Sequence, residues 1–266
     1  MYEFERAAPV TVVLRALSGS VDITAEDRDG IEVEVAAPGG GDASQTQVVL
    51  EGDSLVIRAP AGRRSPRLRI VARVPAGSSV AGESASADVR LAGRFADVQL
   101  GVASAAVNLA EATGNVRLDA ASGDLTVGRV GGALHLKSAS GELHAGDVTG
   151  DVTVETASGR IRLDAVGGSL RAGSASGTIE VGRLRRGQAS VRTVSGDVQV
   201  GVAAGSALWM DLNTVSGRST TDLTAQGDVP PADGPVELEL RVRTVSGHIR
   251  IHRAAPAGVA DDRAVA

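Results

Sequence analysis

The strongest constraint on the fold of this chain is a nine-residue period that runs without gaps from residue 86 to residue 184. The segment divides into eleven units with a shared pattern, small, Gly, any, apolar, any, apolar, any, any, apolar, as in residues 122–130 (SGDLTVGRV). Self-similarity at a short fixed period is typical of repeat architectures, in which each repeat buries its apolar face against its neighbours. We therefore expect a stack of equivalent units.

Each unit predicts one short β-strand followed by a tight corner. Positions four and six are apolar and flank a variable residue, as Val152 and Val154 do around Thr153, and this alternation is typical of a strand. Position two is Gly or Ala in every unit, where a sharply turning backbone benefits from a minimal side chain.

A second period of 18 residues is laid over the first. Two unequal strand-and-corner units per 18 residues predict one coil of a flattened β-solenoid, in which equivalent positions stack about 4.8 Å apart. An antiparallel meander is the alternative, but its alternate turns lie at opposite ends of the sheet, which leaves the uniform corners unexplained. The predicted fold is an all-β solenoid that buries four to six aliphatic side chains per coil. The 18-residue period is seen at position nine, where Ala103, Ala121, Ala139, Ala157 and Ala175 alternate with Val130, Val148, Val166 and Leu184, and at position one, where Ser86, Ser104, Ser122, Ser140, Ser158 and Ser176 share one phase.

Residues 1–76 predict a β-rich N-terminal region, with strands at 10–15, 21–23, 31–35 and 67–74 and a hairpin over 48–57. A solenoid exposes unpaired strand edges at both ends, so we interpret this region as a cap. Residues 17–23 (LSGSVDI) already match the repeat, which predicts that cap and solenoid share one sheet.

The repeat region is predicted over residues 77–252. Its motif persists with wider spacing at residues 193–196, 214–217 and 244–247, each of which reads TVSG. We expect these coils to follow in sequence order, with an insertion at about 218–236 and a final strand at 249–251. Residues 253–266 are small and polar and predict a disordered tail.

Composition excludes several classes of function. The chain has no cysteine, which rules out disulfides and thiolate metal sites, and its net charge of −5 argues against bulk binding to nucleic acid. No run approaches the roughly 18 apolar residues of a membrane span. Residues 1–6 (MYEFER) are acidic where a signal peptide begins with a basic segment, so we predict a cytoplasmic protein.

Repeated SGD segments, such as residues 121–125 (ASGDL) and 194–198 (VSGDV), follow a strand-rich segment that ends in residues 74–77 (VPAG). The chain thereby resembles, over about residues 2–252, a family of uncharacterised bacterial proteins with an adhesin-like β-strand repeat, the domain of unknown function 4097. The resemblance implies a β-solenoid, and it implies no established activity and no catalytic residues.

The acidic residues of the repeat do not match the calcium-binding nonapeptide, which carries a second Gly two positions after the first. Here the acidic residue follows a single Gly or Ala, so we interpret these carboxylates as solvated corner residues. They are Asp88, Asp97, Asp124, Glu142 and Asp151.

The four histidines do not form a predicted metal site either. His135 and His144 occupy position five of consecutive units, which places them on opposite faces of the solenoid. His248 and His252 lie about 13 Å apart by strand rise, too far for one ion. The sequence predicts four exposed strand histidines, no metal and no cofactor.

The sequence also lacks the pattern of a catalytic site. It contains no Gly-x-Ser-x-Gly elbow, Walker loop, dinucleotide fingerprint or His-Glu-x-x-His. Only four aromatic residues could serve as sugar platforms, and we expect Trp209 to pack in the core or the cap. We therefore predict a protein that is not an enzyme.

Two polar features are candidates for an interaction surface. Stacked serines at position one form either a hydroxyl ladder that satisfies corner backbone groups or a flat surface for a repetitive ligand. A basic stretch at 63–73 is either a solvated strand face or a site for an anionic partner. The candidate residues are Ser104, Ser122, Ser140, Ser158 and Ser176, together with Arg67, Arg69 and Arg73.

These observations predict a non-catalytic β-solenoid that acts as a protein interaction or scaffold surface. The alternative is a glycan-binding or carbohydrate-active solenoid associated with the cell envelope. The expected partner is accordingly a protein, with a glycan as the alternative, and the expected state is a monomer or a dimer paired through exposed strand edges.

Overall fold

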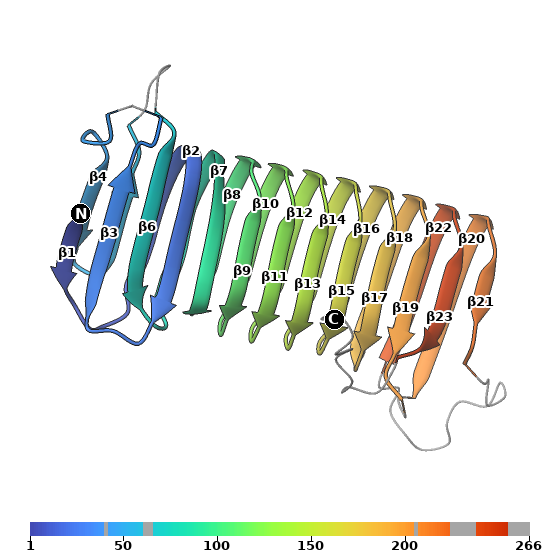
Figure 1. Ribbon diagram of the computed structural model, residues 1–266. Coiled ribbons are helices and arrows are strands. Elements are labelled where there is room, and N and C mark those ends of the chain that lie inside the picture. The colour runs from blue at the N-terminus through green and yellow to red at the C-terminus, as the bar shows by residue number, and fades with distance from the viewer. Residues whose placement is uncertain (40–41, 61–65, 205–206, 224–237, 255–266) are drawn as a thin grey trace, which may run out of the picture.

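The computed structural model of the chain describes all residues except 40–41, 61–65, 205–206, 224–237 and 255–266. It is a stack of parallel coils, each with one strand on either side of a shared core, as Figure 1 shows. The predicted all-β solenoid is thereby confirmed. Over the described residues, no helix is long and apolar enough to cross a membrane.

The regular coils place alternate strands on two faces. Each strand pairs in parallel with the strand 18 residues further along, as β12 pairs with β14 through Leu134 and Val152. The first face contains β8 (Val98–Ser104), β10 (Val116–Ser122), β12 (Leu134–Ser140), β14 (Val152–Ser158) and β16 (Leu170–Ser176). The second face contains β9 (Val107–Ala112), β11 (Leu125–Val130), β13 (Leu143–Val148), β15 (Ile161–Val166) and β17 (Ile179–Leu184).

Every coil buries a small set of aliphatic side chains between the two faces. In the coil of β12 and β13 these are Leu134, Leu136, Leu143, Ala145 and Val148, each at most 1% exposed. This agrees with the predicted four to six inward aliphatics. Such cores have little bulk, so their stability depends on the stacking of one coil on the next.

The two faces bury different positions of the nine-residue unit. On the first face positions four, six and eight point inward, as the burial of Leu134, Leu136 and Ser138 shows. On the second face the alternation breaks after position six, and position nine points inward instead, as Val148 does. Position nine of the first face, for example Ala139, is therefore exposed.

From residue 122 to residue 184, the corner that follows each first-face strand has a glycine of positive φ at position two. Gly159 has a φ of 130°, a conformation that residues with a Cβ rarely adopt. A Cβ at this position would point at the carbonyl oxygen of Gly141 in the preceding coil, far inside van der Waals contact. Both the backbone conformation of the corner and the close approach of the preceding coil therefore require glycine at this position.

The acidic residues at the corners bond to the next coil. The Oδ1 atom of Asp124 accepts the backbone N–H of Glu142 at 2.8 Å, and that of Asp151 accepts the N–H of Ser169 at 2.8 Å. Asn115 serves the same purpose for Ala133 at 2.9 Å. The interpretation of these groups as merely solvated carboxylates was incomplete, because they satisfy amides that the corner leaves without a strand partner.

We expect Asp124→Ala to lower the free energy of unfolding by about 1.5–3 kcal/mol, the usual contribution of a hydrogen bond to a charged group. Asp124→Asn keeps the Oδ1 acceptor, as Asn115 shows, and should lose less than half of that amount. Urea unfolding followed by far-ultraviolet circular dichroism measures both values. Equal losses in the two variants would contradict a role for the acceptor atom.

The N-terminal strands continue the same sheets. β2 (Thr11–Glu26) and β7 (Ser79–Phe95) each run through both faces, and they pair in parallel with Ser18 beside Ser86 and Val21 beside Val89. The prediction that cap and solenoid share one sheet is confirmed. The boundary predicted near residue 76 falls between β6 (Leu68–Pro75) and β7.

Antiparallel strands close the N-terminal end. β5 (Ser54–Arg58) and β6 lie against β2, and β4 (Gln47–Glu51), β3 (Gly30–Ala36) and β1 (Tyr2–Glu5) follow outward by antiparallel pairing. Ile31, Val33 and Leu55 at this end are at most 1% exposed. The N-terminal core is therefore well covered.

The C-terminal coils do not follow in sequence order, which corrects the predicted arrangement. β22 (Leu238–Ser246) pairs with both β18 (Gly187–Ser195) and β20 (Leu208–Ser216), and β23 (Ile249–Arg253) pairs with both β19 (Val198–Val202) and β21 (Ser219–Thr221). The last coil in the sequence thus lies between the two before it. The order in space is Ser195, Ser246, Ser216.

Burial accounts for this exchange of order. β23 supplies the fully buried Ile249 and Ile251, whereas the exposed strand β21 has Ser219 and Thr221 in the same register. The more aliphatic coil takes the inner place, where burial is complete. β21 lies within the predicted insertion 218–236, whose residues 224–236 are outside the described part of the chain, as are residues 255–266 of the predicted tail.

Candidate interaction surface

The most extended apolar feature of the surface is a single line of side chains at position nine of the first face. Each points outward one residue before the stacked serine of its coil. The register of the paired strands shows that these side chains stack from one coil to the next. We call this line the apolar stripe. In coil order it consists of Leu17, Ala85, Ala103, Ala121, Ala139, Ala157, Ala175, Val194, Val245 and Val215.

The two ends of the apolar stripe differ in shape. The alanines line a shallow hollow of about 1010 Å³ that extends from Arg15 to Ala175. Beyond it the valines form a ridge, with Val194 56%, Val245 50% and Val215 78% exposed. These are unusually exposed positions for large aliphatic side chains.

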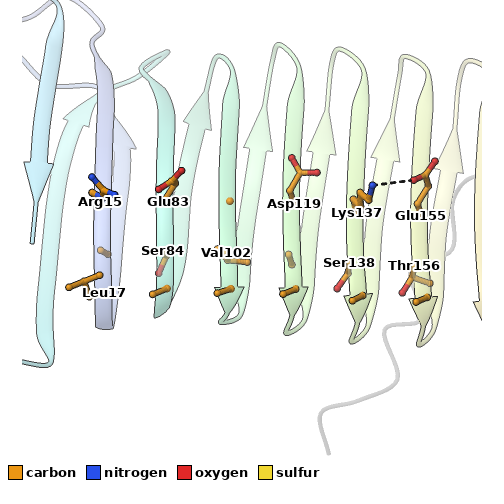
Figure 2. Close-up of a pocket in the computed structure, with 18 of the residues that line it drawn as sticks. Arg15, Leu17, Glu83, Ser84, Val102, Asp119, Lys137, Ser138, Glu155 and Thr156 are labelled. Carbon is orange, nitrogen blue, oxygen red and sulfur yellow. Dashed lines mark ion pairs between the residues drawn. The ribbon is translucent and has the colours of Figure 1, made fainter. Parts of the chain in front are cut away.

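A charged row borders one side of the stripe, at position seven of the first face. Figure 2 shows it above the hollow, with Lys137 pointing toward Glu155 and the hydroxyl side chains of Ser138 and Thr156 below. The Nζ atom of Lys137 lies 3.9 Å from an Oε2 of Glu155. In coil order the charged row is Arg15, Glu83, Gly101, Asp119, Lys137, Glu155, Gly173, Arg192, Arg243 and Asn213.

The predicted serine column borders the other side of the stripe. Its hydroxyls bond along the corner: Ser86 donates to the carbonyl oxygen of Leu17 at 3.0 Å, and Ser122 lies 3.4 Å from the Oγ of Ser104. The column therefore has the geometry of a hydroxyl ladder, and whether it also binds a ligand stays a prediction. The candidate serines Ser104, Ser140, Ser158 and Ser176 are exposed, and Ser122 is half-buried.

The candidate arginines lie elsewhere. Arg69 and Arg73 point outward from β6 on the second face, and Arg67 precedes that strand. Glu32 lies beside Arg73 in the neighbouring strand, and a hydrogen bond from Arg28, with the charges of Arg28 and Arg73, holds the pKa of Glu32 below its usual value. The structure therefore does not bring Arg69 and Arg73 onto the surface that carries the serines.

The histidines are separated, as expected. His135 lies on the first face, 3.9 Å from Asp119, and His144 on the second, with Nε2 3.0 Å from Oδ2 of Asp164. Of the four, only His248 is exposed, and the others are half-buried, so the expectation of four exposed histidines is wrong for three of them. Across the described residues, no three His, Asp or Glu side chains come together in a way that could hold a metal ion.

The prediction for Trp209 is wrong. It lies on the outer face of the edge strand β20, 45% exposed, with the guanidinium of Arg241 5.5 Å from the ring centroid. An arginine stacked on an indole makes a cation–π contact, so the ring already has a partner in the adjacent strand.

The residues of the apolar stripe are recognisable in the sequence, although no exposed apolar column was predicted from them. The alanines at position nine, and the valines of the three TVSG motifs, occupy one column of the solenoid. Period alone does not tell whether that column points inward, because position nine is buried on one face and exposed on the other.

Comparisons with known proteins bear on the family. Aligned solved structures include candidate adhesins from Bacteroides fragilis (13% identity, 94% of this chain and 95% of that chain, TM-score 0.42) and Parabacteroides distasonis (12%, 94% and 95%, 0.37). A candidate cell adhesion protein from Clostridium sporogenes aligns at 8% identity over 94% of each chain, with a TM-score of 0.22. Comparison with curated proteins finds no match. The chain matches the family described as Toastrack DUF4097 over residues 12–254, and it therefore belongs to that family.

Proposed function

We propose that this protein is a non-catalytic scaffold that binds a protein partner along the apolar stripe. The observation that supports this most directly is the stripe itself, a continuous line of ten aliphatic side chains, of which nine are exposed and Leu17 is half-buried. Contiguous apolar surface of this extent, rimmed by polar residues, is typical of interaction sites rather than of free surface.

The architecture suits such a role. Except for Val215 on the edge strand β20, every rung of the stripe sits on a strand that is hydrogen-bonded on both sides, so the surface is rigid before binding. A rigid surface loses little conformational entropy when it binds. The small alanine side chains also let a partner approach the backbone closely.

A glycan ligand is the second candidate. The exposed serine column supplies a regular row of hydroxyls, which could bond to a repetitive polysaccharide. Replacement of Ser140 and Ser158 by alanine should abolish such binding and leave binding at the stripe unchanged. The predicted cytoplasmic location stays a prediction.

The proposed function is tested with Ala139→Asp, which places a charge in the middle of the stripe. The matched control is Ala133→Asp in the same coil, at a corner position where Asp97 and Asp151 occur naturally. Proteins retained from a lysate of the source cells are identified, purified and titrated against all three forms. We expect binding to native protein and Ala133→Asp, and at least about tenfold weaker binding to Ala139→Asp.

Equal binding of a purified partner to all three forms would overturn the proposal. Loss of binding in both aspartate variants would also overturn it, because it would indicate an effect of net charge rather than of the stripe.

A further inference from the structure

We infer that the partner of the apolar stripe is a second copy of this chain, packed antiparallel with stripe against stripe. The twofold axis would pass between the coil of Lys137 and the coil of Glu155. This inference rests on the proposed function, since it uses the same surface, and it commits that surface to one occupant.

Shape is the first argument. The hollow lies over the alanine end of the stripe, and the ridge lies over the valine end. When a second copy packs in the opposite direction, the valine ridge of each copy therefore lies over the alanine hollow of the other. In this arrangement the partner's Val194 lies over Ala103, and the partner's Val245 lies over Ala85. At these two rungs large side chains fill the space that small ones leave, as close packing requires, and at the outermost rung the partner's Val215 lies over the half-buried Leu17.

Charge is the second argument. In the antiparallel dimer the charged rows of the two copies face each other in opposite directions. Lys137 then lies opposite the partner's Glu155, and Glu83 lies opposite the partner's Arg243. The partner's Arg192 lies opposite Gly101, with Glu83 and Asp119 on either side. No two like charges stand directly opposite each other, and such complementarity determines the register of an interface.

The neighbouring registers lack this complementarity. A shift of one coil in one direction places Lys137 against the partner's Lys137, and a shift in the other direction places Glu155 against the partner's Glu155. A parallel pair would set the charged row against the uncharged serine column. One antiparallel register is therefore favoured over the alternatives.

The size of the surface is sufficient for a modest interface. Nine steps between ten rungs span about 43 Å at the spacing of stacked strands. With its two flanking rows the surface would bury about 500 Å² on each copy, or about 1,000 Å² in all, which is in the range of weak interfaces. We expect a dimer that dissociates in the micromolar range.

The geometry is tested by disulfide crosslinking, since the chain has no cysteine of its own. Ala103→Cys and Val194→Cys are made separately, with tags of different mass, then mixed and oxidised gently. The antiparallel dimer places these two positions opposite each other, so the mixture should give a crosslinked heterodimer. Either variant alone should not crosslink, because its two copies of the cysteine lie five coils, about 24 Å, apart, beyond the reach of a disulfide.

The register is tested by charge reversal in sedimentation equilibrium. Lys137→Glu should weaken the dimer at least about tenfold, because it faces the partner's Glu155 twice. Lys137→Glu with Glu155→Lys should restore native affinity. The control reverses a comparable ion pair on the second face, Arg129 and Glu111, 3.2 Å apart, and should leave association unchanged.

Three results would overturn the inference: a native protein that stays monomeric up to about 100-fold above the expected micromolar range, a dimer that Ala139→Asp and Lys137→Glu leave intact, or crosslinks of each cysteine variant with itself. The second would indicate pairing through the free edge of β20. The proposed function is judged separately, by whether a different purified protein still requires Ala139.

Discussion

Gly159→Ala is expected to lower the free energy of unfolding by about 3–5 kcal/mol, one of the largest effects of any single methyl group in this chain. The residue has a φ of 130°, and the new Cβ would point into the carbonyl oxygen of Gly141. The corner cannot relax alone, because that carbonyl belongs to the preceding coil of the stack. Any movement that relieves the clash in one coil therefore displaces the backbone of the neighbouring coil.

The matched control is Gly173→Ala, one coil further along the first face. No atom lies within 4 Å of a Cβ at that position, and its backbone does not require glycine. This variant should be neutral or more stable by up to about 1 kcal/mol, because alanine restricts the unfolded chain. Urea midpoints of the two variants provide the comparison, and equal destabilisation would contradict the role of the corner.

Leu125→Ala is expected to cost about 2–5 kcal/mol, because it leaves a cavity in a core only a few side chains wide. Leu125 is fully buried at the start of β11, between Val107 and Leu143 of the neighbouring coils. Leu125→Asp should prevent the coil from folding, since it buries a charge with no partner. Circular dichroism and urea unfolding measure both effects.

Thr126→Ala serves as the control for Leu125. The two residues are adjacent in β11, but Thr126 points outward and is only half-buried. We expect a change within about 0.5 kcal/mol, as for most surface substitutions. A loss comparable with that of Leu125→Ala would show that strand propensity, rather than core packing, determines the stability of the coil.

Local features of the sequence were sufficient to predict the repeat. Alternation at positions four and six defines a strand, and the glycines at position two define a corner, so both can be recognised within nine residues. The phase of the serines then defines the 18-residue coil. Even the match between residues 17–23 and the repeat was local, and the pairing of Ser18 with Ser86 confirmed it.

Two features were decided only by tertiary structure. The exchange of the last coils depends on a comparison between distant segments: β23 supplies the buried Ile249 and Ile251, whereas β21 has Ser219 and Thr221 in the same register, and burial of the more apolar coil determines the order. The apolar stripe depends on where strand alternation breaks. Ala139 and Val148 occupy the same position of the nine-residue unit, yet only Val148 points inward.

The sequence by itself therefore determined the fold class, the coil length and the corners, because these follow from the conformational preferences of neighbouring residues. The tertiary structure alone decided which coil lies beside which and which column faces solvent. Those outcomes depend on competition for burial among segments that are far apart in the chain, and no local pattern records its result.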